Sequence, residues 1–184
     1  MGQKVVVALA EGFEEIEAVA VVDVMRRAGL KVDIAGIGGE YIEGANAMVL
    51  KSDLDIATVL ADDYDMIVLP GGFGGTDVLA NDERVQTLLK AMNVEGKLIG
   101  AICAAPLALQ KAGILEGDFT CYPSVEQNIQ NSNYTDAKAV VISGNVITSR
   151  GPGTAICFGL EIVKKLCGVE TYEQLREGLL ATYC

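Results

Sequence analysis

Apolar runs of strand length recur along the chain, and helix-forming stretches separate them. Residues 4–9, 31–36, 65–69 and 98–102 each have the length and β-branched character of strands buried on both faces of a sheet. Most of the intervening stretches place apolar residues at helical spacing. This alternation predicts an α/β sandwich with a mostly parallel central sheet. We find no repeat or low-complexity linker, so a single domain over 1–184 is expected.

The first helix is predicted over residues 14–28, with Gly29 as its C-cap. At 100° per residue, Glu17 falls on the apolar side of this helix. Glu14 also points toward the apolar stripe, whereas Glu15 lies at its margin. A carboxylate directed into a core is costly unless it is protonated or hydrogen-bonded, so Glu17 stands out.

The rest of the chain is expected to alternate helices with short β segments. The pattern predicts hairpin-like or irregular structure over 38–52, one helix capped by Thr76 or Asp77 and running to about Met92, and a helix from Ala104 to near Gly113. It then predicts a short strand at 118–121, a polar loop or broken helix at 124–137, and a β-hairpin of 138–143 and 146–149. A helix after Thr154 and a last helix capped by Thr171 complete the chain.

Cys103 lies where the strand at 98–102 ends and a helix begins, with Pro106 in the first turn of that helix. Backbone N–H groups and the helix dipole favour a thiolate at such a position, which predicts a reactive cysteine with a lowered pKa. The alternative is that Cys103 merely packs in the core, because free cysteine is among the most buried residue types.

A glycine-rich turn, Gly-Gly-Phe-Gly-Gly at residues 71–75, follows the third predicted strand. Parallel strands meet at one carboxyl edge, so Gly71 and Gly72 are expected near Cys103, with their amides lining an active-site rim. A plain flexible turn is the alternative. A dinucleotide-binding fingerprint is rejected, because the spacing is not G-x-G-x-x-G and the turn does not follow the first strand.

Composition narrows the chemistry further. The chain contains no histidine, so a Cys-His or Ser-His dyad is excluded and the commonest metal ligand is missing. The five cysteines are an odd number, widely spaced and without CxxC pairs, which predicts reduced thiols and neither a disulfide framework nor a zinc site. We expect no metal and no cofactor.

The charge and the distribution of apolar residues bear on partners and location. A formal net charge of −11 argues against nucleic acid as a partner. No stretch approaches the roughly 18 apolar residues that a membrane span needs, and the N-terminal run is too short for a signal-peptide core. We therefore expect a cytoplasmic protein with no membrane contact.

Several separated segments match one known family. They are Glu14-Glu15-Ile16-Glu17-Ala18, Val24-Met25-Arg26-Arg27-Ala28-Gly29, Val68-Leu69-Pro70-Gly71-Gly72, Ala101-Ile102-Cys103-Ala104-Ala105-Pro106 and Thr148-Ser149-Arg150-Gly151-Pro152-Gly153-Thr154. With these the chain resembles the DJ-1/PfpI superfamily, in particular its DJ-1 and YajL branch, formerly called ThiJ. The resemblance covers essentially the whole chain. It implies a flavodoxin-like three-layer sandwich, a homodimer, and a cysteine on a strained nucleophile elbow.

The resemblance also implies roles for particular residues. Cys103 matches the family's reactive cysteine, and Glu17 matches the glutamate that hydrogen-bonds it in the protonated state. Gly72 and Ala104 match positions whose amides face the sulfur or a substrate oxyanion. Arg27 and Arg150 match basic positions near the pocket or the dimer contact, with plain surface charge as the alternative.

Two positions depart from the family pattern. The residue after the cysteine is Ala104, where the protease-like branch has histidine, so a peptidase dyad is excluded. Tyr122 stands where the DJ-1 branch has a histidine before a proline. Tyr122 can donate a hydrogen bond, but tyrosine is a poorer general base at neutral pH. Activity that depends on that histidine should be weaker or should use Glu17.

Three functions remain open at this point. The first is an enzyme that acts on reactive aldehydes through Cys103 and Glu17, as a glutathione-independent glyoxalase or a deglycase of early glycation adducts. The second is a non-catalytic oxidative-stress sensor or redox-regulated chaperone in which Cys103 oxidises to sulfinic acid. The third is a partner-binding sandwich with an inert, buried cysteine.

Overall fold

A seven-stranded sheet forms the centre of the computed structural model, which describes residues 2–184. Its strand order is β5-β2-β1-β6-β7-β9-β8, and every neighbouring pair is parallel except β8 and β9. The strands are β1 (Lys4–Ala10), β2 (Lys31–Ile37), β5 (Leu54–Asp55), β6 (Met66–Leu69), β7 (Leu98–Ile102), β8 (Val140–Ser143) and β9 (Val146–Ser149). The predicted α/β fold, with a mostly parallel sheet and a β-hairpin, is confirmed.

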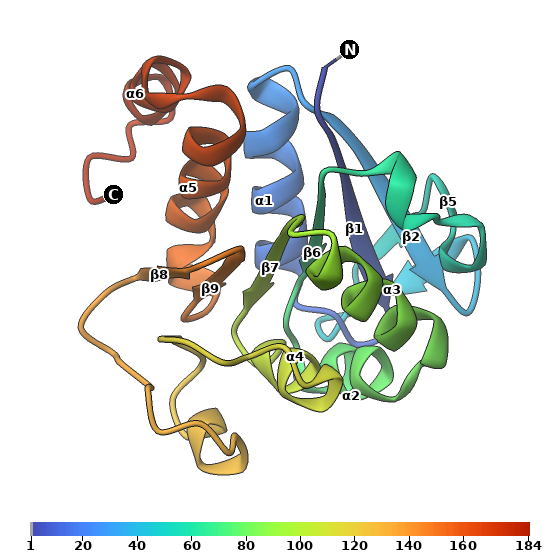
Figure 1. Ribbon diagram of the computed structural model, residues 1–184. Helices are drawn as coiled ribbons and strands as arrows, with labels where there is room; N and C mark the ends of the chain where they lie inside the picture. Colours follow the sequence, from blue (N-terminus) through green and yellow to red (C-terminus); the bar gives the residue numbers. More distant parts are fainter. Residues whose placement is uncertain (1) are drawn as a thin grey trace.

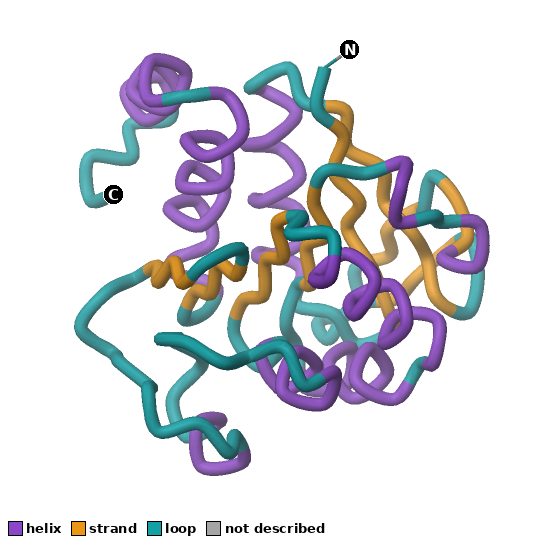
Figure 2. The backbone as a smooth tube through the Cα atoms, viewed as in Figure 1, coloured by secondary structure: helices purple, strands orange, loops and turns teal. Residues whose placement is uncertain are grey.

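Helices cover both faces of this sheet (Figure 1). One layer contains α1 (Glu15–Arg27) and α5 (Ala155–Cys167), with α6 (Val169–Gly178) packed on α5. The other contains α2 (Phe73–Asn81), α3 (Glu83–Val94) and α4 (Pro106–Ala112). Short 3-10 helices occupy Ile56–Thr58, Ala61–Asp63, Val125–Asn128 and Pro152–Thr154. Figure 2 shows that the segment between α4 and β8 is mostly loop, as its polar sequence predicts.

The central strands explain where a site can form. Helices cover both faces of β1, β6 and β7, so these strands read as nearly continuous buried apolar runs. Because β1, β6, β7 and β9 are parallel, their carboxyl ends lie along one edge. The loops that begin at Glu11, Pro70, Cys103 and Arg150 therefore meet there. Open α/β sheets carry their ligand sites at this edge.

A second, small hairpin fills the region expected to be hairpin-like. Strands β3 (Tyr41–Glu43) and β4 (Val49–Lys51) pair in antiparallel register. The hairpin loop is tied to α1 by Glu15, whose carboxylate accepts hydrogen bonds from the Asn46 backbone N–H at 2.6 Å and the Asn46 Nδ2 at 2.9 Å. Glu15 is buried, although its helical phase places it at the margin of the apolar stripe, because the hairpin folds over it.

The single helix expected up to Met92 is in fact two helices. Asp82 interrupts the helical pattern, and its carboxylate accepts hydrogen bonds from the N–H groups of Arg84 and Val85 at the start of α3. Such capping favours a new helix over continuation of the old one. Thr76 is a buried residue inside α2 and not its cap, because the helix already begins after Gly72.

Two smaller expectations at the level of secondary structure are also wrong. The segment 118–121 is not a strand: it forms only an isolated bridge from Phe119 to Tyr134. The Thr120 N–H donates to a side chain, the Thr148 Oγ1 at 2.9 Å, and not to the backbone carbonyl of a neighbouring strand. The last helix begins after Gly168 and not at Thr171, because helical backbone already starts at Val169.

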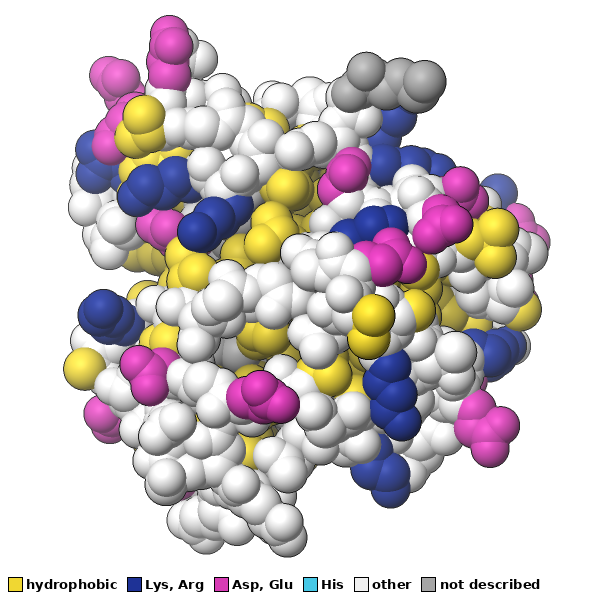
Figure 3. Space-filling view, in the orientation of Figure 1, with side chains coloured by type: hydrophobic (Ala, Val, Ile, Leu, Met, Phe, Trp, Pro, Cys, Tyr) yellow, Lys and Arg dark blue, Asp and Glu magenta, His cyan; other side chains and the backbone are white. Residues whose placement is uncertain are grey.

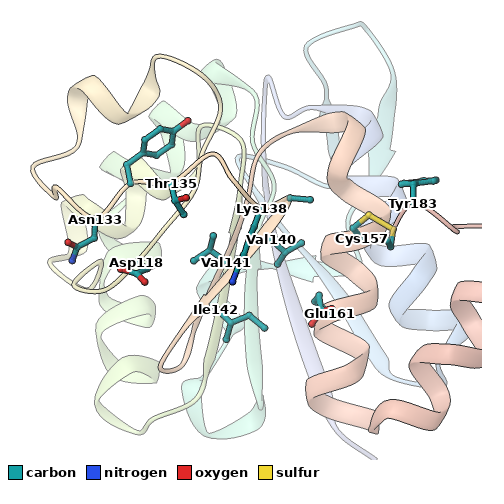
Figure 4. A pocket seen from close by; sticks show the side chains of 13 residues that line it. Asp118, Asn133, Thr135, Lys138, Val140, Val141, Ile142, Cys157, Glu161 and Tyr183 are labelled. Atoms are coloured by element: carbon teal, nitrogen blue, oxygen red, sulfur yellow. A yellow bond between two sulfur atoms is a disulfide. The ribbon is translucent and has the colours of Figure 1, made fainter.

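The prediction that all cysteines are reduced is wrong for two of them. Cys157 in α5 and Cys184 form a disulfide across a sequence separation of 27 residues. Figure 4 shows this disulfide on the wall of a cavity of about 800 Å³ beside β8, the edge strand of the sheet. Cys103, Cys121 and Cys167 remain free.

The distribution of charged side chains on the surface and the apolar character of the helices can be compared with the sequence. On the face shown in Figure 3, Lys and Arg side chains are scattered among Asp and Glu side chains. None of the helices between residues 2 and 184 has both the length and the apolar character needed to cross a bilayer.

Candidate active site

Cys103 lies on a sharp turn between β7 and α4. Its backbone φ is +63°, a left-handed conformation that costs a non-glycine residue roughly 1–3 kcal/mol. Hydrogen bonds on both sides hold it there: the Cys103 N–H donates to the Ser149 carbonyl at 3.0 Å, and the Tyr122 N–H donates to the Cys103 carbonyl at 2.8 Å. Cys103 is 6% exposed, so the residue is almost completely buried.

Glu17 reaches the same point from the first turns of α1. Its side chain is fully buried, in agreement with its inward helical phase. One carboxyl oxygen, Oε2, accepts a hydrogen bond from the Gly71 N–H at 2.7 Å. The other, Oε1, has no partner of good hydrogen-bond geometry among the described residues. The Cys103 thiol is close enough to this carboxyl group for each group to shift the pKa of the other.

Gly71 and Gly72 complete the site from the end of β6. A Cβ on Gly71 would lie 2.5 Å from the Cβ of Cys103 and 2.6 Å from Oε2 of Glu17, so only glycine leaves room for both side chains. Gly72 has a φ of +88°, which glycine adopts readily. The backbone N–H groups of Gly72 and Ala104 lie near the Cys103 sulfur and act to lower the pKa of the thiol.

The protonation of the pair differs from the expectation for Cys103. Burial raises the pKa of Glu17 to about 7. Burial, followed by the negative charge of Glu17, raises the pKa of Cys103 to about 12, against the opposing effect of the two amides. The predicted lowering of the thiol pKa is therefore wrong, because burial is the largest cause of the shift and the charge of Glu17 adds to it. The repulsion ends when Glu17 is protonated, so the two groups titrate as a pair.

The remaining predicted site residues lie at different distances from this centre. Tyr122 lies beside Cys103, because its backbone N–H donates to the Cys103 carbonyl. Arg150 follows β9 at the same edge, but its guanidinium donates to the Asp136 carbonyl at 3.0 Å. Arg27 pairs with Asp23 at 2.7 Å on the exposed side of α1, about 15 Å along the helix from Glu17. Arg27 is therefore not part of this centre.

Sequence reasoning missed Phe73 as a site residue. Phe73 follows Gly72 directly, and its ring packs edge-to-face against that of Tyr122, with centroids 6.2 Å apart. Its position inside the glycine-rich turn was the available signal. No group of three or more His, Cys, Asp or Glu side chains within residues 2–184 is arranged to hold a metal ion. The groups at this edge are a thiol, a carboxyl group, backbone amides and two aromatic rings.

The fold and this arrangement define a class: flavodoxin-like α/β proteins with a cysteine on a strained strand-to-helix turn. The model of the DJ-1/PfpI family matches residues 3–165, and the chain belongs to this family. The chain is 44% identical over 186 residues to Protein dj-1beta of Drosophila melanogaster, covering all of both chains. The crystal structure of Drosophila melanogaster DJ-1beta has a TM-score of 0.94 to this chain at 43% identity, covering 98% of each.

Two further relatives are informative about chemistry. The chain is 39% identical over 170 residues to a Caenorhabditis elegans protein named glutathione-independent glyoxalase DJR-1.2, covering 92% of this chain and 91% of that one. An oxidized DJ-1 structure from Toxoplasma gondii has a TM-score of 0.93 at 34% identity, covering 97% of this chain and 98% of that one.

The raised pKa of Glu17 predicts a specific pH dependence of stability. The pKa rises from 4.5 to about 7 on folding, so the folded protein binds more protons than the unfolded chain between these values, and stability falls as pH rises through this window. Between about pH 5.5 and pH 8.5, wild type should lose about 2 kcal/mol of unfolding free energy relative to Glu17→Gln. Urea denaturation at the two pH values measures this difference.

The exposed Glu177→Gln variant is the control and should keep the wild-type pH dependence. The lower pH stays above the isoelectric point near 4.4, where a protein loses the net charge that keeps it soluble. If the unfolding free energies of wild type and Glu17→Gln changed equally with pH, the raised pKa of Glu17 would be contradicted.

Proposed function

We propose that this protein is a glutathione-independent glyoxalase that converts small α-oxoaldehydes such as methylglyoxal to α-hydroxy acids. The carrying observation is that the Cys103 side chain and the Glu17 carboxyl group are buried together against Gly71, with the Gly72 and Ala104 amides near the sulfur. The name of the Caenorhabditis elegans relative supports the same chemistry. Early glycation adducts formed by such aldehydes are a second substrate class for the same two groups.

The first step is addition of the thiol to the aldehyde. A free thiolate need not accumulate, because the Glu17 carboxylate takes the thiol proton as the carbon–sulfur bond forms. With a pKa of about 7, Glu17 can accept and release a proton near neutral pH. The oxyanion that develops on the aldehyde is held by the Gly72 and Ala104 amides and receives the proton, which gives a hemithioacetal.

The second step is an internal redox exchange that needs no external oxidant. Glu17 removes the proton from the former aldehyde carbon and delivers it to the neighbouring carbonyl carbon. The hydroxyl proton of the hemithioacetal passes to the ketone oxygen. The aldehyde carbon is thereby oxidised to a thioester on Cys103, and the ketone carbon is reduced to an alcohol. Water then hydrolyses the thioester, which releases lactate and restores the thiol. The sum is methylglyoxal plus water to lactate.

Lactate formation in glutathione-free buffer tests this proposal. Purified wild-type protein should produce lactate from methylglyoxal, and heat-denatured protein at the same concentration should not exceed the buffer rate. Absence of lactate would overturn the glyoxalase proposal.

An oxidative-stress sensor is the second candidate function, and the oxidized Toxoplasma gondii relative favours it. The Cys103 sulfur would react with two molecules of hydrogen peroxide to give sulfinic acid and two molecules of water. The amides of Gly72 and Ala104 would stabilise the charged product. A chain that forms no lactate but selectively gains two oxygen atoms on Cys103, detected by intact mass, would have this function.

We also propose that a second copy of this chain covers the outer surface of α1. Ile16 and Val19 on α1 are exposed apolar residues, as are Met48 and Val49 on the neighbouring hairpin. The Glu15 hydrogen bonds join these two elements into one surface. Each such side chain contributes roughly 1.5–3 kcal/mol when it is fully buried, so a self-complementary contact would be stabilised.

Ile16→Asp is expected to weaken this dimer at least about a hundredfold, because a carboxylate in an apolar contact is left unpaired. Analytical ultracentrifugation over a range of concentrations measures the dissociation constant. Val94→Asp on the exposed end of α3 is the control and should associate like wild type. A monomeric wild type, or a dimer unaffected by Ile16→Asp, would contradict the assignment of this surface.

A further inference from the structure

An exposed aromatic pair lies beside the buried thiol. Phe73 is 65% exposed and Tyr122 is 40% exposed, and the two rings are 6.2 Å apart in an edge-to-face arrangement. A large apolar side chain exposed to this extent gains little from the fold. Its position next to a reactive cysteine makes it a candidate for ligand recognition.

The backbone fixes both rings close to Cys103. Phe73 follows Gly72, a Cβ on whose neighbour Gly71 would lie 2.5 Å from the Cβ of Cys103. Tyr122 donates its own N–H to the Cys103 carbonyl at 2.8 Å. The main chain of both residues is therefore held next to the thiol.

The Tyr122 ring also borders the Glu17 side of the site. A Cβ on Gly151 would lie 3.2 Å from the Tyr122 ring and 4.0 Å from Oε1 of Glu17. The ring thus lies between Phe73 on one side and the position next to the unpartnered carboxyl oxygen on the other. Both rings are therefore close to the two groups that a substrate would have to reach.

We propose that Phe73 and Tyr122 are specificity-determining residues that favour electrophiles carrying a flat apolar substituent, such as an aryl group. A single aromatic pair is a weak interaction, so exposed rings can separate and take a planar group as a new partner. For the substrate, this means an aryl-substituted α-oxoaldehyde is preferred over glyoxal, which has no such group. That part rests on the proposed glyoxalase function, whereas recognition at the thiol does not.

Alkylation of Cys103 tests recognition without catalysis. N-phenylmaleimide and N-methylmaleimide both form a carbon–sulfur bond across their C=C bond, and the thiol proton ends on the adjacent carbon. The readout is the ratio of their second-order rate constants at Cys103, followed by peptide mass and divided by the same ratio for free glutathione. Cys103→Ser identifies any signal from Cys121 or Cys167.

The normalised ratio should be well above one in wild type and should fall about tenfold in Phe73→Ala, equivalent to about 1.4 kcal/mol. Tyr122→Phe should retain the ratio, since it keeps the ring, whereas Tyr122→Ala should lower it. Tyr183→Ala removes a similarly exposed aromatic side chain far along the sequence and should leave the ratio unchanged.

Three outcomes would overturn the proposal. A ratio that is unchanged in Phe73→Ala shows that the rings make no contact with the aryl group, and a ratio that rises shows that they block it. Failure of wild-type Cys103 to react with either maleimide shows that the pair does not open to a ligand.

The kcat/KM values for phenylglyoxal and glyoxal then extend the test to substrates. The preference for phenylglyoxal should fall about tenfold in Phe73→Ala, parallel to the maleimide ratio. If neither aldehyde is converted while the maleimide ratio behaves as expected, the glyoxalase function fails and the recognition site stands. Conversion of both aldehydes with equal preference in wild type and Phe73→Ala would overturn the role of the rings in substrate choice.

Discussion

Replacing Cys103 with alanine is expected to reduce lactate formation from methylglyoxal about a thousandfold or more. The thiol forms the covalent bond to the aldehyde. Of the other free cysteines, Cys121 precedes Tyr122 but is fully buried, and Cys167 is at the end of α5. Alanine occupies the same backbone position without the sulfur, so folding should be preserved. Initial rates of lactate formation, with circular dichroism as a folding check, measure the effect.

Cys167→Ala is the matched control and should keep the wild-type rate, because Cys167 is a half-buried thiol outside the site. A Cys103→Ala protein with more than about a tenth of the wild-type rate would show that the chemistry does not pass through the thiol. Glu17→Gln in the same assay separates the two groups, since it retains the thiol and removes the proton carrier.

Reduction of the Cys157–Cys184 disulfide is expected to destabilise the protein by about 3 kcal/mol. The crosslink closes a loop of 27 residues, and releasing it restores chain entropy to the unfolded state. For a protein of this size, the melting temperature should fall by roughly 10 °C. Dithiothreitol supplies the two electrons and two protons and is itself oxidised to a cyclic disulfide.

Thermal unfolding with and without dithiothreitol measures the loss. Cys184→Ser should melt at the lower temperature in both conditions, and Cys167→Ser should respond like wild type. A wild-type protein whose melting temperature is insensitive to the reductant, with two thiols appearing on mass analysis, would contradict a stabilising role.

Much of the site could be predicted because it depends on strand ends and helical phase. The apolar runs before Gly71 and Cys103 specify buried parallel strands, and the carboxyl ends of such strands must meet. The phase of α1 directs Glu17 inward. These three residues come together in the structure by rules that act over short stretches of sequence.

The features that could not be predicted depend on contacts between distant segments. Cys157 and Cys184 meet only because α6 packs on α5 and the segment after α6 returns to α5, which no spacing rule specifies. Glu15 is buried by a hairpin thirty or so residues away in sequence. The direction of the shift in the Cys103 pKa depends on burial and on the neighbouring charge of Glu17. Both raise the pKa and outweigh the backbone amides, which lower it and which the sequence does predict.

The missing histidines have a practical consequence for studying this site. Histidine is the side chain that ordinarily changes charge between about pH 5 and pH 8, and this chain contains none. The Glu17 carboxyl, with its pKa of about 7, therefore titrates in a pH range in which no histidine changes charge and the α-amino group is the main other contributor. Infrared difference spectra of the carboxyl C=O band can follow its proton in the unlabelled protein, and the same band reports any ligand that displaces or shares that proton.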